Sequence, residues 1–233
     1  MRAHATFFDL IARALRLTAA RLPLYSAAVA VAVVLQALPV YFHAPHALEI
    51  GEYVVPPLLT TLVYAFVWAD MQAEPPGSPA IWERFLERAW AVIVIDFIAT
   101  QLFSLAFLTS AGGDLAGMLA SLPLLLLSGL IVFADAIATA EDGIAAWWLV
   151  PWAFWRSVRV SWNAVVLMRA IAILALWLLA GSAANLLSAA FGAAHLPAAD
   201  FWGEAPLTAL LTPPIAALTL LVYRDAQPAS CSG

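Results

Sequence analysis

Charged residues are scarce in this sequence. They make up 11% of its 233 residues, hydrophobic residues make up 64%, and the mean hydropathy is +0.93. A soluble globular domain carries roughly 25% charged residues. The shortage of charge therefore argues against a water-soluble domain and predicts a chain that lies mostly in a lipid bilayer.

Cysteine is almost absent, and the usual signatures of catalysis are missing. The single cysteine, Cys231, lies in a polar C-terminal segment, which excludes a disulfide framework and a cysteine-based metal site. The sequence also contains no phosphate-binding Gly-x-x-x-x-Gly-Lys loop, no Gly-x-Ser-x-Gly elbow and no His-Glu-x-x-His. We predict that the protein is not an enzyme and uses no cofactor.

Residue types that can bind a metal do occur in two of the predicted outer loops. Their spacing matches no zinc signature, and Pro45 argues against a helix that presents both histidines of the first loop. We expect a solvated acidic loop there and no metal site. The residues are His43, His46, Glu49, Glu52, His195, Asp200 and Glu204.

Long apolar runs are the main feature that the sequence does contain. Runs of about 17 to 24 residues are long enough for a helix to cross a hydrocarbon core of ~30 Å. The alternating segments of an outer-membrane barrel are missing. The first run is too long for a cleavable signal, and no clear cleavage site follows it, so we expect it to stay as a helix. The six predicted spans are 24–42, 53–69, 89–109, 115–134, 164–187 and 206–223.

The distribution of arginine predicts how these spans are oriented. All ten basic residues are arginines, and with six spans they all fall on one side of the membrane or just inside it. The positive-inside rule then places both termini in the cytoplasm, in a multi-pass protein of the inner membrane. Anionic lipid headgroups are the expected partners of these arginines, and nucleic acid is not. A membrane-protein partner or a second copy of the chain stays open.

A pattern of proline, apolar run and aspartate occurs three times. The even-numbered spans begin at proline and end in aromatic-x-Asp, each odd-numbered span carries one amide, and an amphipathic leader with arginine precedes each odd span. We predict an all-α, polytopic membrane helix bundle of three helical hairpins with leader helices, forming one domain over residues 1–233. The units are about 7–70, 81–135 and 152–225, followed by a flexible tail, 226–233.

Short motifs in the last part of the chain resemble a bacterial group. They are Glu141-Asp142-Gly143, Trp155-Arg156-Ser157 with Asn163, and Leu211-Thr212-Pro213 leading to Tyr223-Arg224-Asp225. Residues 125–225 resemble six-helix inner-membrane families, mostly uncharacterised, that include the membrane region of glycerophosphoryl diester phosphodiesterases. The resemblance implies a six-helix membrane domain. It does not imply catalysis, because this sequence contains no soluble phosphodiesterase domain.

The polar residues inside the spans are the candidate site. Asp96 lies near the middle of the third run, where a carboxylate costs about 2.5–3.5 kcal/mol. It should face the bundle, where it is either held by an amide or hydroxyl such as Gln36, Gln101 or Thr100, or acts in proton or ion coupling. Arg169 should extend to the headgroups, and we expect no pairing between it and Asp96. The candidate intramembrane amides are Gln36, Gln101 and Asn185.

The three helix-ending aspartates need compensation. A carboxylate at a helix C-terminus is disfavoured by ~0.3–1 kcal/mol because of the helix dipole. The arginines of the leaders lie on the same side of the membrane, so we predict ion pairs that hold neighbouring units together. The alternatives are a cytoplasmic entrance for a cation or substrate, and aspartates that are simply solvated by water. The predicted members are Asp70, Asp135, Asp225, Arg84, Arg88, Arg156 and Arg159.

Three functions stay open at this point. The lack of catalytic motifs and the arginine leaders favour a non-enzymatic protein that organises membrane lipids or proteins. The repeat and Asp96 favour a small transporter or permease-like protein, although three parallel hairpins provide no inverted pair. A lipid-modifying enzyme has the least support.

Helix packing is predicted at the small residues 180–184 of the fifth run.

Overall fold

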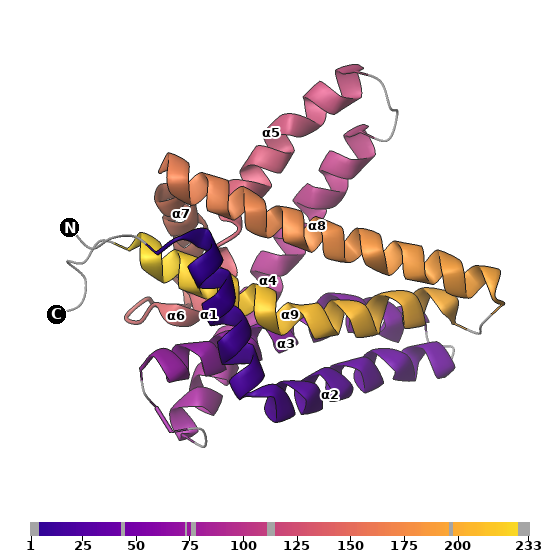
Figure 1. Cartoon of the computed structure of the whole chain (residues 1–233), viewed down its shortest axis with the longest axis horizontal. Coiled ribbons are helices and arrows are strands. Elements are labelled where there is room, and N and C mark those ends of the chain that lie inside the picture. Colours follow the sequence, from indigo (N-terminus) through magenta and orange to yellow (C-terminus); the bar gives the residue numbers. More distant parts are fainter. Residues whose placement is uncertain are drawn as a thin grey trace.

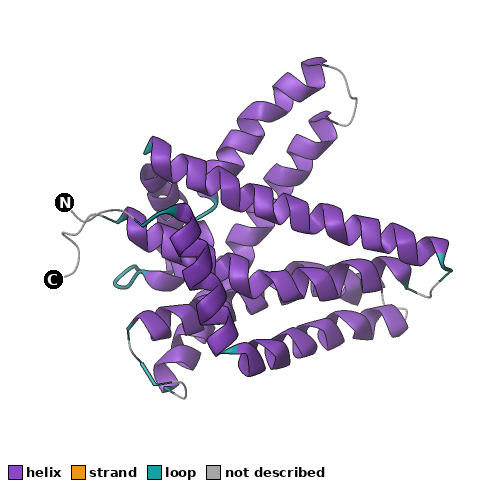
Figure 2. Ribbon diagram, in the orientation of Figure 1, coloured by secondary structure: helices purple, strands orange, loops and turns teal. Residues whose placement is uncertain are grey.

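The computed structural model describes residues 5–42, 45–72, 74–75, 78–110, 115–195 and 198–227. All regular structure in these ranges is helical (Figure 2), which confirms the predicted all-α membrane helix bundle. The helices are α1 (Phe7–Ala20), α2 (Leu22–Tyr41), α3 (Pro45–Met71), α4 (Pro79–Ser110), α5 (Leu115–Ile131), α6 (Ala134–Ala140), α7 (Leu149–Ser161), α8 (Ala164–Ala193) and α9 (Ala199–Ala226), and a 3₁₀ turn, η1 (Ala146–Trp148), precedes α7.

Several described helices are long and apolar enough to cross a membrane. Five segments meet this condition alone, and a sixth is formed if α1 and α2, which meet at a bend of 80°, are counted as one span. The chain is therefore a multi-pass membrane protein. The five segments are Tyr53–Met71, Pro79–Ala106, Leu119–Ala140, Ala164–Ala193 and Phe201–Ala226.

The first leader forms a separate helix because its start and its apolar face are both well defined. The side chain of Thr6 accepts a hydrogen bond from the backbone of Asp9, whose carboxylate in turn accepts one from the backbone of Thr6. Leu10 and Ala14 are buried where α1 packs on α9. Leu15, the residue after Ala14, is 54% exposed, because the buried stripe is centred on Leu10 and Ala14.

The second and third leaders differ from each other in how they join their spans. Ser78 precedes α4 and Pro79 begins it, and α4 then runs without a break for 32 residues from the leader into the span. The third leader is α7, which is separate from α8. Asn163 caps α8 by accepting a hydrogen bond from the backbone of Val165 at 2.9 Å.

The helices are arranged as neighbouring hairpins around α9. Figure 1 shows α8 running beside α9, α2 and α3 on the other side of α9, and the α4–α5 hairpin diverging from these helices toward its tip. At the opposite end, the short α6 and α7 cross the bundle. The most completely buried side chains lie there and include Phe133, Ile137, Val222 and Tyr223.

Close packing of α8 on α9 depends on a glycine that the sequence did not single out. A Cβ at position 203 would overlap the backbone nitrogen of Ser188 on α8. The predicted small-residue segment contributes less, because only Ala180 and Ala184 of its members are buried. Gly203 is thus the closest approach of the two helices at a described glycine.

We expect Gly203→Ala to destabilise the protein by about 1–3 kcal/mol, because the added methyl group must push two helix backbones apart. Thermal unfolding in detergent micelles, followed by far-UV circular dichroism, measures the effect. Gly192→Ala on α8 is the matched control, since a Cβ there meets no atom within 4 Å. Equal melting temperatures for the two variants would contradict the assigned contact.

Candidate functional site

A cavity of about 430 Å³ lies between α3, α4, the α5–α6 segment, α8 and α9. Its walls are largely apolar, but each of these segments contributes at least one hydroxyl, amide or carboxyl group. A cavity of this size is in the range of about 300–1,000 Å³ that is typical of small-molecule sites. Among the polar lining residues are Thr60, Thr100, Ser104, Ser128, Ser182 and Asn185.

Asp96 lines this cavity from the middle of α4. Ile95 beside it is almost fully buried, and Phe97 on its other side is 47% exposed, so the helix turns the carboxylate toward the bundle. The predicted inward orientation therefore agrees with the structure. Asp96 borders a cavity and is not enclosed by packed side chains.

Asp135 also lines the cavity, and here the sequence prediction was wrong. Asp135 was predicted to end its helix and to pair with an arginine of a leader. Instead, after a short interruption at residues 132–133, α6 continues to Ala140, so Asp135 lies inside the Leu119–Ala140 span. Its Oδ1 atom is buried and has no hydrogen-bond partner among the described residues.

The interruption that places Asp135 is stabilised by a serine from α7. The backbone nitrogen of Phe133 donates to Ser157 Oγ at 3.2 Å, and Ser157 Oγ donates to the carbonyl oxygen of Leu130 at 2.7 Å. One hydroxyl thus satisfies a donor and an acceptor that the break would leave unpaired. The side chain of Ser157 is fully buried, which fits this role.

Asp96 and Asp135 contribute two carboxyl groups to the same cavity. No basic side chain lines the cavity in the described part of the chain. Two negative charges in a site of low dielectric constant repel each other strongly and need a counter-charge. The cavity that Asp96 and Asp135 line can therefore hold a proton or a cation.

The predicted intramembrane amides are only partly brought together. Asn185 lines the cavity with Asp96, whereas Gln36 on α2 is half-buried and Gln101 on α4 is exposed, and neither lines it. Of the partners proposed for Asp96, only Thr100 shares its cavity. Helical spacing explains why Gln101 does not line the cavity, because a residue five positions after Asp96 projects from a different face of α4.

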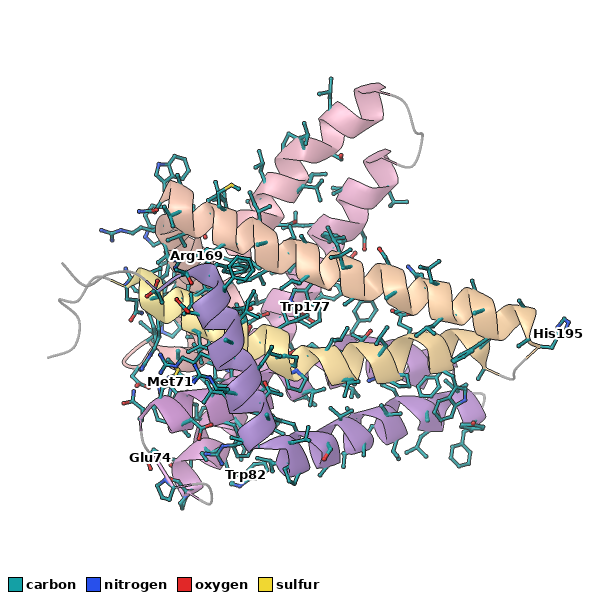
Figure 3. All side chains as sticks on the ribbon, in the orientation of Figure 1. Met71, Glu74, Trp82, Arg169, Trp177 and His195 are labelled. Carbon is teal, nitrogen blue, oxygen red and sulfur yellow. The ribbon has the colours of Figure 1, made fainter. Side chains whose placement is uncertain are left out.

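The other two helix-ending aspartates do form ion pairs, but with arginines outside the predicted set. Both carboxylate oxygens of Asp70 accept hydrogen bonds from Arg21 Nε at 2.9 Å. Asp225 accepts one from Arg169 at 2.6 Å, and Arg169 also donates to the carbonyl oxygen of Ala5 at 2.7 Å. Arg169, labelled in Figure 3, thus binds protein groups at the end of the bundle, where it was expected to reach lipid headgroups.

The arginines of the second leader bind the turn after α6. Arg84 donates to Asp142 at 2.6 Å and to the carbonyl oxygen of Thr139 at 2.6 Å, and its guanidinium lies 3.6 Å from the centre of the Trp68 ring. Arg88 is 3.9 Å from Asp142, and its buried Nε has no partner among the described residues. Predicted pairing of these arginines with Asp70, Asp135 or Asp225 was therefore wrong.

Glu141 joins α6, α7 and α9. Its carboxylate accepts hydrogen bonds from Trp152 Nε1 at 2.7 Å, from Arg156 Nε at 3.2 Å and from the hydroxyl of Tyr223. Burial opposes the charge of Arg156, but hydrogen bonds and charge interactions with Tyr223 and Glu141 together raise its pKa. Arg159, predicted in the same group as Arg156, is exposed. The sequence indicated Glu141 only as part of the motif Glu141-Asp142-Gly143, and its role in joining these helices was not predicted.

A packed layer separates the cavity from these ion pairs. Along α9, Thr219 lines the cavity, Tyr223 lies one turn further, and Asp225 ends the helix. Phe133 and Tyr223 are fully buried, with ring centroids 6.3 Å apart. We call the region of Arg21, Arg84, Arg156 and Arg169 the arginine end of the bundle.

The outer-loop residues with metal-binding potential form no site in the described part of the chain. His43 and Cys231 lie outside the described residues, as do the side chains of His46, Glu49, Glu52 and Asp200. Figure 3 shows His195 at the tip of the α8–α9 hairpin, pointing away from the bundle. The described residues include no group of three His, Cys, Asp or Glu side chains that could hold a metal ion.

Comparison with protein-family models, with characterised proteins and with solved structures gives no match. The resemblance of residues 125–225 to six-helix inner-membrane families therefore stays a prediction. The fold and the site define the class: an all-helical, multi-pass membrane protein with a two-carboxylate cavity among its spans.

Proposed function

We propose that this protein is a small membrane transporter whose central cavity moves protons, with a solute bound beside them. The observation that supports this is the presence of Asp96 and Asp135 in one cavity, with no basic residue in its described lining. Intramembrane carboxyl groups that can exchange a proton are the elements of proton relays in pumps and transporters.

Energetic cost favours this function over a purely organising one. A carboxylate near the middle of a span, such as Asp96, costs about 2.5–3.5 kcal/mol, and a protein that only holds lipids or partners together gains nothing from that cost. An ion-paired carboxylate would recover part of it, as Asp70 and Asp225 do. Asp135 has a buried oxygen without a hydrogen-bond partner among the residues that the structure describes, which fits a group that must exchange its ligand.

The arginine end of the bundle indicates how the protein is oriented in the membrane and how it contacts lipid headgroups. By the positive-inside rule, we place this end and both termini in the cytoplasm of a bacterial cell, with the protein in the inner membrane. Trp147, Trp155 and Trp162 are 78%, 63% and 78% exposed on and around α7, where indole rings and arginines suit a headgroup region. Anionic lipids are the proposed partners of this surface.

Proton flux into liposomes tests the proposed function. Protein reconstituted into vesicles that contain a pH-sensitive dye should acidify the interior under an inward proton gradient, several-fold faster than empty vesicles. Asp96→Asn and Asp135→Asn should each reduce the flux at least about ten-fold, since an amide cannot exchange a proton at neutral pH. Glu83→Gln, an exposed carboxylate on α4, is the matched control and should leave the flux unchanged. Native flux equal to that of empty vesicles would contradict the proposal.

A further inference from the structure

The cavity combines its two carboxyl groups with a wall of aromatic and aliphatic side chains. Phe103 on α4, Tyr64 on α3 and Trp177 on α8 line it together with Ile95, Leu174 and Leu178. Figure 3 shows Trp177 where α8 passes the interior of the bundle. The residue also packs against the main hydrophobic core, so its indole is held in place.

This combination favours a ligand that is both cationic and apolar. An anion would meet two carboxyl groups and no basic lining residue. A divalent metal ion would need about six or more oxygen ligands, whereas most of the wall here is hydrocarbon. An ammonium group, in contrast, donates up to three hydrogen bonds and is attracted to the faces of tryptophan, tyrosine and phenylalanine.

We infer that the cavity binds a hydrophobic organic ammonium compound, such as an aryl-alkyl amine, with its charge at Asp96 and Asp135 and its ring against Trp177. The inference rests on the proposed transport function, for which it names the substrate class. The buried Oδ1 of Asp135, which has no partner among the described residues, is the acceptor for the ammonium. A bound ammonium would supply the counter-charge that the two carboxyl groups need.

Binding of radiolabelled tryptamine to the purified, full-length protein in detergent tests the inference. Unlabelled tryptamine should compete, whereas 3-methylindole, which is neutral, and indole-3-propionate, which is an anion, should not compete at a hundred-fold excess. These three compounds share the indole ring, so they separate recognition of the charge from recognition of the ring.

Variants assign the binding to the cavity. Asp135→Asn keeps the side-chain shape and should weaken tryptamine binding at least about ten-fold, the equivalent of about 1.4 kcal/mol. Trp177→Leu should weaken it by about two- to twelve-fold, the range expected for loss of a contact between two aromatic rings. Glu83→Gln should bind tryptamine like the native protein. Native-like binding by Asp135→Asn would overturn the inference.

The outcomes distinguish the inference from the proposed function. Equal competition by 3-methylindole would overturn the inference, because charge would then not be recognised. Absence of tryptamine binding, with Asp96-dependent proton flux intact, would also overturn it and leave the transport proposal standing. Asp135-dependent tryptamine binding without any proton flux in vesicles would support the amine site and contradict the transport proposal.

Discussion

Replacing Glu141 with alanine is expected to destabilise the protein by about 2–4 kcal/mol, the largest loss among single side-chain truncations at the arginine end. The substitution removes the shared acceptor of Trp152, Arg156 and Tyr223. Arg156 is then left with a side chain that is only 20% exposed and has lost its carboxylate. Thermal unfolding in detergent, followed by circular dichroism, should show the loss.

Two further variants separate this cluster from ordinary surface charge. Glu141→Gln should have a smaller effect than alanine, because its amide oxygen can still accept a hydrogen bond from Arg156 or Tyr223. Glu83→Ala removes an exposed carboxylate and should change the stability by less than about 0.5 kcal/mol. If Glu141→Ala and Glu83→Ala had the same melting temperature, the contacts made by Glu141 would not stabilise the packing of these helices.

Replacing Asp135 with leucine is expected to stabilise the protein while abolishing proton flux. The native carboxyl group lies in a span, with one oxygen buried and without a partner among the described residues. Removing an unpaired buried polar group recovers about 1–3 kcal/mol. A leucine cannot exchange a proton, so vesicles that contain the variant should acidify no faster than empty ones. Melting temperature and flux measured on the same preparation test both parts.

Asp225→Asn is the control variant for the expected stabilisation by Asp135→Leu, because it should change the stability in the opposite direction. Asp225 is paired with Arg169, so loss of its charge should lower the melting temperature. A stabilised Asp135→Leu beside a destabilised Asp225→Asn would show that the two aspartates, which follow the same sequence pattern, differ in their surroundings. A strongly destabilised Asp135→Leu would contradict the view that this carboxyl group is kept for function.

The sequence predicts the spans well because the signals that define them are local. Length and hydropathy are properties of a single segment, and five of the six predicted spans agree with described helices that meet both conditions alone, whereas the first, 24–42, meets them only together with α1. Helix starts are also local, as Ser78 before α4 and Asn163 before α8 show, since a capping side chain acts within three residues. The inward orientation of Asp96 could be predicted because a carboxylate facing lipid would cost too much.

The site itself could be predicted only in part, because it depends on contacts between distant segments. The aromatic-x-Asp pattern is the same at Asp70, Asp135 and Asp225, but only the α5–α6 break has Ser157 to satisfy its backbone, so only that helix continues past its aspartate. The partners of Arg84 and Arg156 were missed for a similar reason. Asp142 and Glu141 become available to them only when the turn after α6 folds back.

The contacts of Arg169 have a consequence for the order of assembly during synthesis. This side chain on α8 bonds to the backbone of Ala5, ahead of α1, and to Asp225, at the end of α9. Helix α1 also packs mainly on α9, which follows it in the sequence by about 180 residues. Helix α1 must therefore wait at the membrane surface until α9 has been synthesised, and only then can these contacts form.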